Sequence, residues 1–450
     1  MRPGSAGAGP YRALAGNREI RALLSASLIS TAGDQLARVA VSVLVFQRTH
    51  SALLTSLTYA LTFLPALIGG PLLGGLADRC PRRTVMISAD LIRAVLIATL
   101  TLPVLPLPVA WLLLALVTIT EAPFDASRAA LLPQAAGAGY PRALAADRIV
   151  QQSGQVVGFA ASGLLLLALT PRATLILDAA TFLISAAILR RGVPDRAAAA
   201  HDPHPAPDRK TIGRRAITDL RVTFATVTGN RQAWMAVRTV WLAAAVAIVP
   251  EGLAAPYAAT LRPGAATVGL LLAANPVGNV VGGLLAARTR PAARVKRLTP
   301  LTLLVCIPLG LCAWHPGLLL VVLLVACSGA GMSVSLLART LFVEAIDDTA
   351  RGRAFALAAT GITVIQGLTI GLAGAAADHW SPATVVGTAG ILGIVLTGVQ
   401  WQATRRAYHT PTPTARPDHP PVAPAGAPPE QPQPATTPRE PWRAAHSGRR

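Results

Sequence analysis

Long apolar stretches separated by short polar turns fill most of this chain. Twelve of them approach or exceed the roughly 20 apolar residues that a helix needs to cross a bilayer. They are residues 20–47, 51–76, 84–104, 107–130, 144–169, 172–191, 232–256, 264–287, 299–315, 317–341, 353–377 and 382–403. The pattern predicts an all-α membrane protein with twelve transmembrane helices in two six-helix bundles.

Polar segments divide the chain further. The stretch between the two bundles contains His, Pro, Asp and Arg and then becomes amphipathic around Phe224 and Val227, which predicts a linker with one surface helix. The chain after residue 403 is rich in Pro, Ala and Thr and is predicted to be disordered. The expected parts are an N-terminal tail (1–19), a first bundle (20–191), the linker (192–231), a second bundle (232–403) and a Pro-rich tail (404–450).

The two halves carry matching residues at a nearly constant offset. Gly16-Asn17-Arg18 opens the first predicted helix, and Gly229-Asn230-Arg231 opens the seventh. At an offset of 211 residues, the matching pairs are Arg128 and Arg339, Arg142 and Arg353, Gln155 and Gln366, and Gly163 and Gly374. A shared offset at corresponding points of two six-helix halves predicts parallel repeats, a transporter plan with the substrate path at the repeat interface.

The basic residues predict the orientation. Almost all of the 40 Lys and Arg residues fall on one side of the predicted helices. The exceptions are three arginines in outer loops and three inside predicted helices, namely Arg48, Arg172, Arg262, Arg38, Arg93 and Arg238. Because cytoplasmic loops are enriched in Lys and Arg, the basic side is predicted to be cytoplasmic, with both termini there.

Composition and motifs argue against several other functional classes of protein. The chain is 52% hydrophobic and 13% charged, so its net charge of +20 reflects loop topology and not nucleic-acid binding. No Gly-x4-Gly-Lys-Ser/Thr loop for ATP occurs. The four cysteines lack metal-ligand spacing, and the eight histidines are scattered, so no disulfide, metal, cofactor or enzymatic site is expected.

A charged turn separates the second and third predicted helices: Gly74-x-Leu76-Ala77-Asp78-Arg79-Cys80-Pro81-Arg82-Arg83. It resembles the signature loop of the major facilitator superfamily, although Pro81 stands where that family usually has glycine. The resemblance implies a cytoplasmic gate containing Gly74, Asp78, Arg79, Arg82 and Arg83, joined by Asp125 and Arg128. The equivalent turn of the second half, residues 282–288, has no acid.

Further strings are similar to bacterial exporters of this superfamily, a group that includes the enterobactin exporter and macrolide-efflux-type proteins. They are Gly33-Asp34, Asp90-Leu91-x-Arg93-Ala94, Phe124-Asp125-Ala126-Ser127-Arg128 and Asp178-Ala179-x-Thr181-Phe182. Two drug-antiporter signatures are missing. The fourth helix lacks Arg-x-x-Gln-Gly, and the fifth has Gly154, Gly158 and Gly163 without the glycine-proline pair, a spacing that favours close helix packing.

Acidic residues inside the predicted helices are the candidate transport residues, because charges in the bilayer are costly and usually functional. Asp34 falls near mid-membrane, and Arg38 follows one turn later, so they form either a static ion pair or a proton or substrate site. Glu121 shares a helix face with Asp125 and Arg128 and lies deeper than both.

Other polar residues leave two interpretations open. Glu251, in a Pro-Glu-Gly string, marks either a helix break along the path or an outer-face acid. Arg93 and Arg238 are expected to extend to the cytoplasmic interface, and Asp178 is ambiguous in the same way. The uncharged candidates, either interhelical contacts or cavity lining, are Gln151, Gln155, Asn275, Asn279 and Gln366.

Together these features predict a monomeric secondary active transporter in a bacterial plasma membrane. It is expected to couple protons to the export of a small organic molecule such as an antibiotic, a siderophore or another metabolite, by alternating access. The 4% aromatic content argues against broad multidrug transport. An uptake permease and a non-transporting receptor or scaffold of the same fold are the alternatives. Asp34 and Glu121 argue against the scaffold, which has no need for acids in lipid.

Overall fold

The computed structural model describes residues 16–73, 80–196, 221–262, 264–287 and 294–409. Throughout these ranges the regular secondary structure is helical, as predicted. Four predictions fall wholly or largely outside them. These concern the N-terminal tail, most of the gate loop with Gly74, Asp78 and Arg79, most of the linker, and the Pro-rich tail from residue 410 on.

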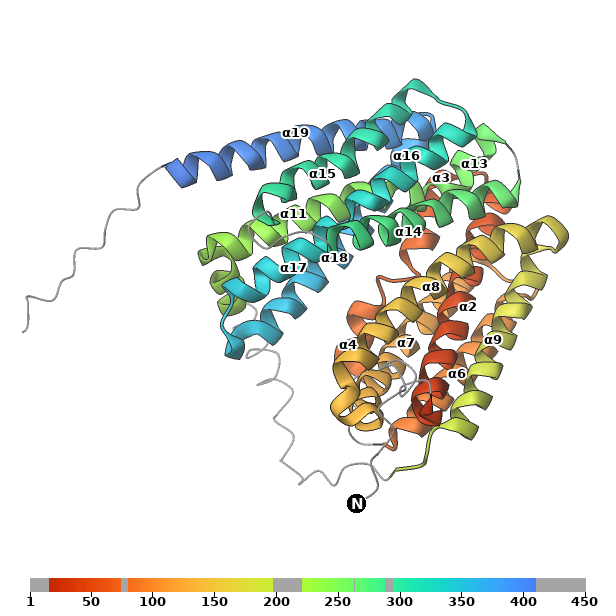
Figure 1. Ribbon diagram of the computed structural model, residues 1–450. Helices are drawn as coiled ribbons and strands as arrows, with labels where there is room; N and C mark the ends of the chain where they lie inside the picture. The colour runs from red at the N-terminus through yellow and green to blue at the C-terminus, as the bar shows by residue number, and fades with distance from the viewer. Residues whose placement is uncertain (1–15, 74–79, 197–220, 263, 288–293, 410–450) are drawn as a thin grey trace, which may run out of the picture. The chain divides into compact units, whose positions relative to one another are not determined.

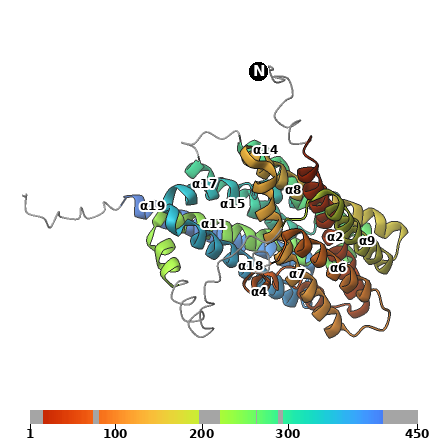
Figure 2. The same cartoon turned by 90° about the horizontal axis from the view of Figure 1, so that it is seen from below.

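The described residues of the first half form seven α-helices, which Figure 1 labels. They are α2 (Arg18–Thr49), α3 (Ala52–Ala60), α4 (Ala66–Leu73), α6 (Arg82–Leu100), α7 (Leu107–Ala136), α8 (Tyr140–Ala168) and α9 (Pro171–Gly192), with the short 3-10 helix η1 (Gly137–Gly139) between α7 and α8. In this half α9 packs against both α2 and α6, and the three lie side by side in Figures 1 and 2.

The second half is built in the same way. Its helices are α11 (Arg231–Ala247), α12 (Val249–Gly252), α13 (Ala254–Leu261), α14 (Ala265–Ala287), α15 (Arg294–Leu311), η3 (Cys312–Trp314), α16 (Leu318–Gly331), α17 (Val334–Ala345), α18 (Asp348–Ala377) and α19 (Pro382–His409). In the linker, the described residues 221–229 are also helical, with Val227 buried and Phe224 exposed.

Nine helical segments of the described chain are long and apolar enough to cross a membrane. This number is compatible with twelve predicted spans, because α7 and α8 form one continuous segment, Leu107–Ala168. In addition, the second span is broken, and α6 carries Arg82, Arg83, Asp90 and Arg93 within its 19 residues. Many large apolar side chains point outward, as expected of helices that face lipid.

The second predicted span is not one helix. It breaks into α3 and α4 around residues 61–65. Pro65 has no N–H to donate to the carbonyl of Leu61, which accepts instead from the hydroxyl of Thr118 at 3.1 Å. The neighbouring carbonyl of Thr62 accepts from Arg38 at 3.3 Å. Side chains of α7 and α2 therefore satisfy the backbone groups that the break exposes.

Several helices are longer than predicted on the side where the arginines gather, which we call the basic side. The fourth helix extends to Ala136 instead of residue 130, the fifth begins at Tyr140 instead of 144, the ninth begins at Arg294 instead of 299, and the eleventh begins at Asp348 instead of 353. The twelfth extends to His409 instead of 403, so the first residues of the predicted Pro-rich tail are helical. Their polar ends gave no apolar signal, although they continue the helices without interruption.

The repeat appears in the structure as the same type of helix cap in each half. The Asn17 side chain accepts from the backbone N–H groups of Glu19 and Ile20 at the start of α2 and donates to the carbonyl of Ala135 at 2.9 Å. Asn230 accepts from the N–H of Ala233 and donates to the carbonyl of Ala345 at 2.8 Å. Each half thus uses one asparagine to begin its first helix and to hold the end of another.

Small residues bring the two halves together between α8 and α14. A Cβ added to Gly269 would lie 2.3 Å from the Cα of Gly163, so the two backbones touch there. In the first half, Gly158 similarly lies against the backbone of Ala32 in α2. These contacts confirm the close-packing interpretation of the glycine string in the fifth helix.

Candidate functional site

A buried arginine forms the centre of the first half. Arg93, on α6, is only 1% exposed, and its guanidinium lies 4.8 Å from the ring centroid of Phe124 and 4.5 Å from that of Phe182. It donates to Asp90 Oδ1 at 2.5 Å and pairs with Asp34 Oδ2 at 3.7 Å. The aromatic rings compensate part of the hydration that this cation loses.

Two predictions about these residues were wrong. The ion pair that the structure gives Asp34 is with Arg93, from the facing helix α6, and not with Arg38. Arg93 does not extend to the cytoplasmic interface, because its two carboxylate partners lie inside the bundle. Arg38 instead donates to the backbone break at Thr62.

Asp178 adds a further carboxylate beside this group. It is fully buried on α9, and the Thr181 hydroxyl lies 3.3 Å from its Oδ1. A Cβ on Gly33 would lie 2.3 Å from the same oxygen, so only glycine at this position lets α2 and α9 approach around the acid. Asp178 is thus an interior acid next to Asp34, not an interfacial one.

Glu121, on α7, is partly buried and lies within electrostatic range of Asp34, Asp125, Arg38 and Arg93. From the sequence, Asp34 and Glu121 were expected on separate helices, and no pattern indicated that the two side chains lie close together. The structure brings both to the interior of the first half, with Arg93 between the acids of three helices.

Arg128 belongs to a second charged group at the basic side. Its guanidinium pairs with Asp125, which shares its helix face, at 3.0 Å and also with Asp147 of α8. The amide oxygen of Gln151, one turn beyond Asp147, accepts from the same guanidinium. Arg128 and Asp147 are buried, so this cation joins α7 to α8 through neutralising partners.

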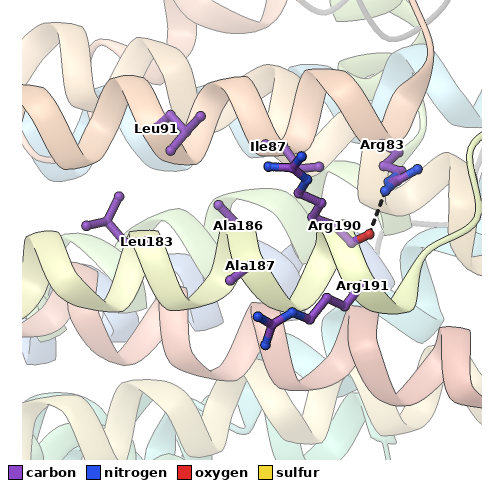
Figure 3. A pocket seen from close by; sticks show the side chains of 8 residues that line it. All are labelled: Arg83, Ile87, Leu91, Leu183, Ala186, Ala187, Arg190 and Arg191. Carbon is purple, nitrogen blue, oxygen red and sulfur yellow. Dashed lines mark hydrogen bonds between the residues drawn. The ribbon is translucent and has the colours of Figure 1, made fainter.

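The described arginines of the gate motif contact the ends of other helices. Arg82 donates to the carbonyl of Ala130 at 3.2 Å, and Arg83 donates to the carbonyl of Arg190 at 2.5 Å. Figure 3 shows Arg83 and Arg190 at one end of an apolar groove between α6 and α9, lined further along by Leu91 and Leu183. These contacts hold the start of α6 against α7 and α9.

Two acid contacts join the halves on the side opposite to the basic one. The hydroxyl of Tyr59 donates to Glu251 Oε2 at 2.8 Å. Asp378, at the end of α18, accepts from the N–H of Ala52 at 2.7 Å and from the hydroxyl of Ser51 at 3.1 Å, where it caps α3. The helix is interrupted on both sides of Glu251, which agrees with the interpretation of the Pro-Glu-Gly string as a helix break.

The uncharged candidates differ in whether they form hydrogen bonds to another helix or within their own helix. Asn275 is buried and donates to the carbonyl of Ala247 at 3.4 Å, which joins α14 to α11. Gln155 accepts from Gln152 at 3.1 Å within α8. Gln366 and Asn279 are partly buried on α18 and α14.

A cavity of about 790 Å³ lies among α8, α11, α17 and α18. We call it the arginine cavity. Its polar lining includes two cations and an amide, and its aromatic lining comes from the second half. The principal side chains are Arg148, Gln152, Trp241, Arg339, Phe342 and Phe355. None of these six was singled out from the sequence as a ligand contact.

Sequence reasoning missed other residues for a common reason. Asp147, Tyr59 and Asp378 act through partners 19 to 327 positions away, and no local pattern marks such partners. One signal was available: Asp90 lies three residues before Arg93, a helical spacing at which opposite charges meet.

A multi-pass fold whose described secondary structure is helical, with two repeated halves and buried charges inside the first half, is the architecture of a membrane transporter. Residues 23–254, just over half of the chain, match the family model described as Major Facilitator Superfamily. The chain belongs to this superfamily, whose membership indicates transport of small molecules across a bilayer rather than catalysis.

A curated relative is the uncharacterized MFS-type transporter YfiS of Bacillus subtilis (strain 168). It is 30% identical over 169 residues, which cover 37% of this chain and 40% of that protein. The match thus spans less than half of the relative's length.

Solved structures confirm the fold over nearly the whole chain. The peptide transporter POT in complex with sulfate has a TM-score of 0.70 at 10% identity and covers 89% of this chain and 99% of its own. A bacterial homolog of the human lysosomal transporter Spinster, in an inward-facing and occupied conformation, has a TM-score of 0.65 at 14% identity, with coverage of 89% and 98%. At these identities the likeness establishes the fold alone.

Proposed function

We propose that this chain is a proton-coupled exporter of a small organic molecule. It acts as a monomer in a bacterial plasma membrane, with both termini and the basic side in the cytoplasm. The observation that carries the proposal is the charge balance around Arg93. Three interior carboxylates, those of Asp34, Asp90 and Asp178, surround one guanidinium.

Unpaired charge is costly in an apolar bundle. Asp34 and Asp90 share the positive charge of Arg93, Arg38 acts on Asp34 without forming an ion pair, and Asp178 is bonded within the described chain only to Thr181. A proton is the smallest ligand that balances the excess, and its gain or loss changes the partners of Arg93. Asp34 is the proposed exchange site because its side chain is 16% exposed, whereas that of Asp90 is fully buried. Glu121 is the proposed second proton site.

The second charged group is the proposed gate. Arg128 with Asp125 and Asp147 holds α7 and α8 together on the basic side. The loop with Gly74, Asp78 and Arg79, which lies outside the described residues, is proposed to belong to the same gate. Arg82 and Arg83 fix the helix that follows this loop. The resemblance to the enterobactin and macrolide exporters supports export over uptake.

Proteoliposomes test the proposal. Full-length protein is reconstituted with a pH-sensitive dye inside, and siderophores, macrolides and simple organic acids are offered under an imposed pH gradient. Expected is substrate-dependent proton movement in the wild type and in Asp347→Asn, an exposed acid between α17 and α18 whose side chain makes no capping hydrogen bond and which serves as the control. Asp34→Asn and Glu121→Gln should lose it.

The same vesicles determine direction. If substrate moves with the protons instead of against them, the chain is an uptake permease. If Asp34→Asn and Glu121→Gln both retain normal coupled transport, the assignment of the proton sites is wrong.

A further inference from the structure

The arginine cavity carries two exposed arginine side chains and no acid among its described lining residues. Arg148 belongs to α8 and Arg339 to α17. Neither guanidinium forms an ion pair with a carboxylate of the described chain. Asp147, adjacent to Arg148 in sequence, pairs with Arg128 instead.

The repeat shows why Arg339 is without a carboxylate. Arg339 is the counterpart of Arg128 in the second half, 211 positions later. In the first half, Arg128 is neutralised by Asp125 and Asp147 and bonded by Gln151. The same arginine therefore occurs twice in the fold, once with its own acids and once without.

At the same offset, the three partners of Arg128 become Leu336, Ala358 and Ile362. All three line the arginine cavity. The second half thus replaces two acids and an amide by apolar side chains at the positions that face the cavity. This change leaves Arg339 with a positive charge that a ligand can neutralise, since a carboxylate or phosphate is the natural partner of a guanidinium fork.

Aromatic side chains form the adjacent wall. The guanidinium of Arg339 lies 5.4 Å from the ring centroid of Phe355, and that ring packs edge-on against Phe342 with centroids 5.0 Å apart. The indole N–H of Trp241 donates to the carbonyl of Ala358 at 3.0 Å, which fixes its orientation. The chain is poor in aromatics, and three of its few rings gather here.

We propose that the arginine cavity binds an amphipathic organic anion as the transported substrate. Its carboxylate, sulfonate or phosphate contacts Arg339 and Arg148, and its apolar or aromatic body lies against Trp241, Phe342 and Phe355. The volume of about 790 Å³ is that of a site for a drug-sized ligand. This inference rests on the proposed transport function and names the substrate class. An anionic lipid has the same chemistry, so the test separates a soluble anion from a lipid headgroup.

The probe is 2-naphthoate, an aromatic carboxylate, and 2-naphthamide is its uncharged counterpart of nearly equal shape. Binding to the full chain is measured by isothermal titration calorimetry in nanodiscs of phosphatidylcholine. We expect 2-naphthoate to bind at least about tenfold more tightly than the amide, since hydrogen bonds to charged groups are worth more than neutral ones.

Two pairs of variants locate the site. Arg339→Ala should weaken binding roughly tenfold to a hundredfold, whereas Arg142→Ala, an exposed arginine outside the cavity lining, should leave it unchanged. Leu336→Asp places an acid where Asp125 stands in the other half and should weaken binding as strongly, whereas Leu336→Asn should not. Equal melting curves for Leu336→Asp and Leu336→Asn keep the comparison independent of folding.

Three results would overturn the inference. One is equal affinity for naphthoate and naphthamide. Another is equal binding by the Arg339→Ala and Arg142→Ala variants. The third is loss of naphthoate binding when phosphatidylglycerol is added to the nanodiscs, because the site would then belong to a lipid headgroup. The proposed function fails separately: naphthoate bound through Arg339 but moved without protons refutes the coupling and leaves the site intact.

Discussion

The hydroxyl of Tyr59 on α3 donates a hydrogen bond of 2.8 Å to Glu251 Oε2 on α12, and this contact joins the two halves of the transporter. Both residues lie at interruptions of their helices, since α3 ends at Ala60 and α12 is a four-residue segment between α11 and α13. The contact must form and break if the halves move against each other during transport.

Tyr59→Phe removes only the donor and should slow transport while retaining the fold. Hydrogen bonds to charged groups contribute about 1.5 to 3 kcal/mol, so a lower melting temperature is expected as well. Glu251→Gln keeps an acceptor and should have a smaller effect. A double-mutant cycle on thermal unfolding measures the coupling, and strictly additive effects of the two changes would mean that the contact has no energetic weight.

Substitutions of Arg93 and Asp34 should have very different effects on folding. Arg93→Ala leaves Asp90 buried without a counter-charge, and removing one partner of a buried pair costs roughly 3 to 5 kcal/mol. We expect little folded protein from this variant, whereas Asp34→Asn, with its more distant and partly exposed side chain, should fold normally. Size-exclusion profiles and melting curves of both variants check this. A stable Arg93→Ala protein would contradict the structural role of the pair.

The contact between Gly163 and Gly269 predicts a strict size limit. Gly269→Leu inserts a side chain where even a Cβ would meet the backbone of α8, and such overpacking costs about 1 to 3 kcal/mol. Transport should fall because α8 and α14 can no longer approach. Gly283→Leu is the matched control, since a Cβ there meets nothing within 4 Å on the same helix. Similar transport rates and melting curves for the two variants would show that this crossing is not needed.

Substitutions in the proposed gate should change the rate of transport without changing its substrate specificity. Asp147→Asn leaves the buried Arg128 with Asp125 as its carboxylate partner, and Asp78→Ala removes the acid of the loop motif. Both should slow transport severalfold while the order of preference among substrates stays the same. Initial rates in proteoliposomes for two substrates measure this. A changed preference would place these residues in the substrate site, and unchanged rates would remove them from the gate.

The sequence alone determined the class, the fold and the repeat. Apolar length predicts helices that cross a membrane, because the bilayer leaves few other options for the backbone. The two Gly-Asn-Arg strings correctly marked the starts of α2 and α11, since capping is a local interaction within three residues. Asp125 with Arg128 was also predictable, because helical spacing fixes which side chains on one helix can meet.

Only the tertiary structure decided the partners across helices. Asp34 pairs with Arg93 because the facing helix α6 supplies a guanidinium inside the bundle, and Arg38 instead donates to the carbonyl of Thr62 at the helix break. The tertiary structure also separated two arginines that the sequence made equivalent. Arg128 lies among acids and Arg339 among apolar and aromatic side chains, since neighbours from other helices set the surroundings of a charge.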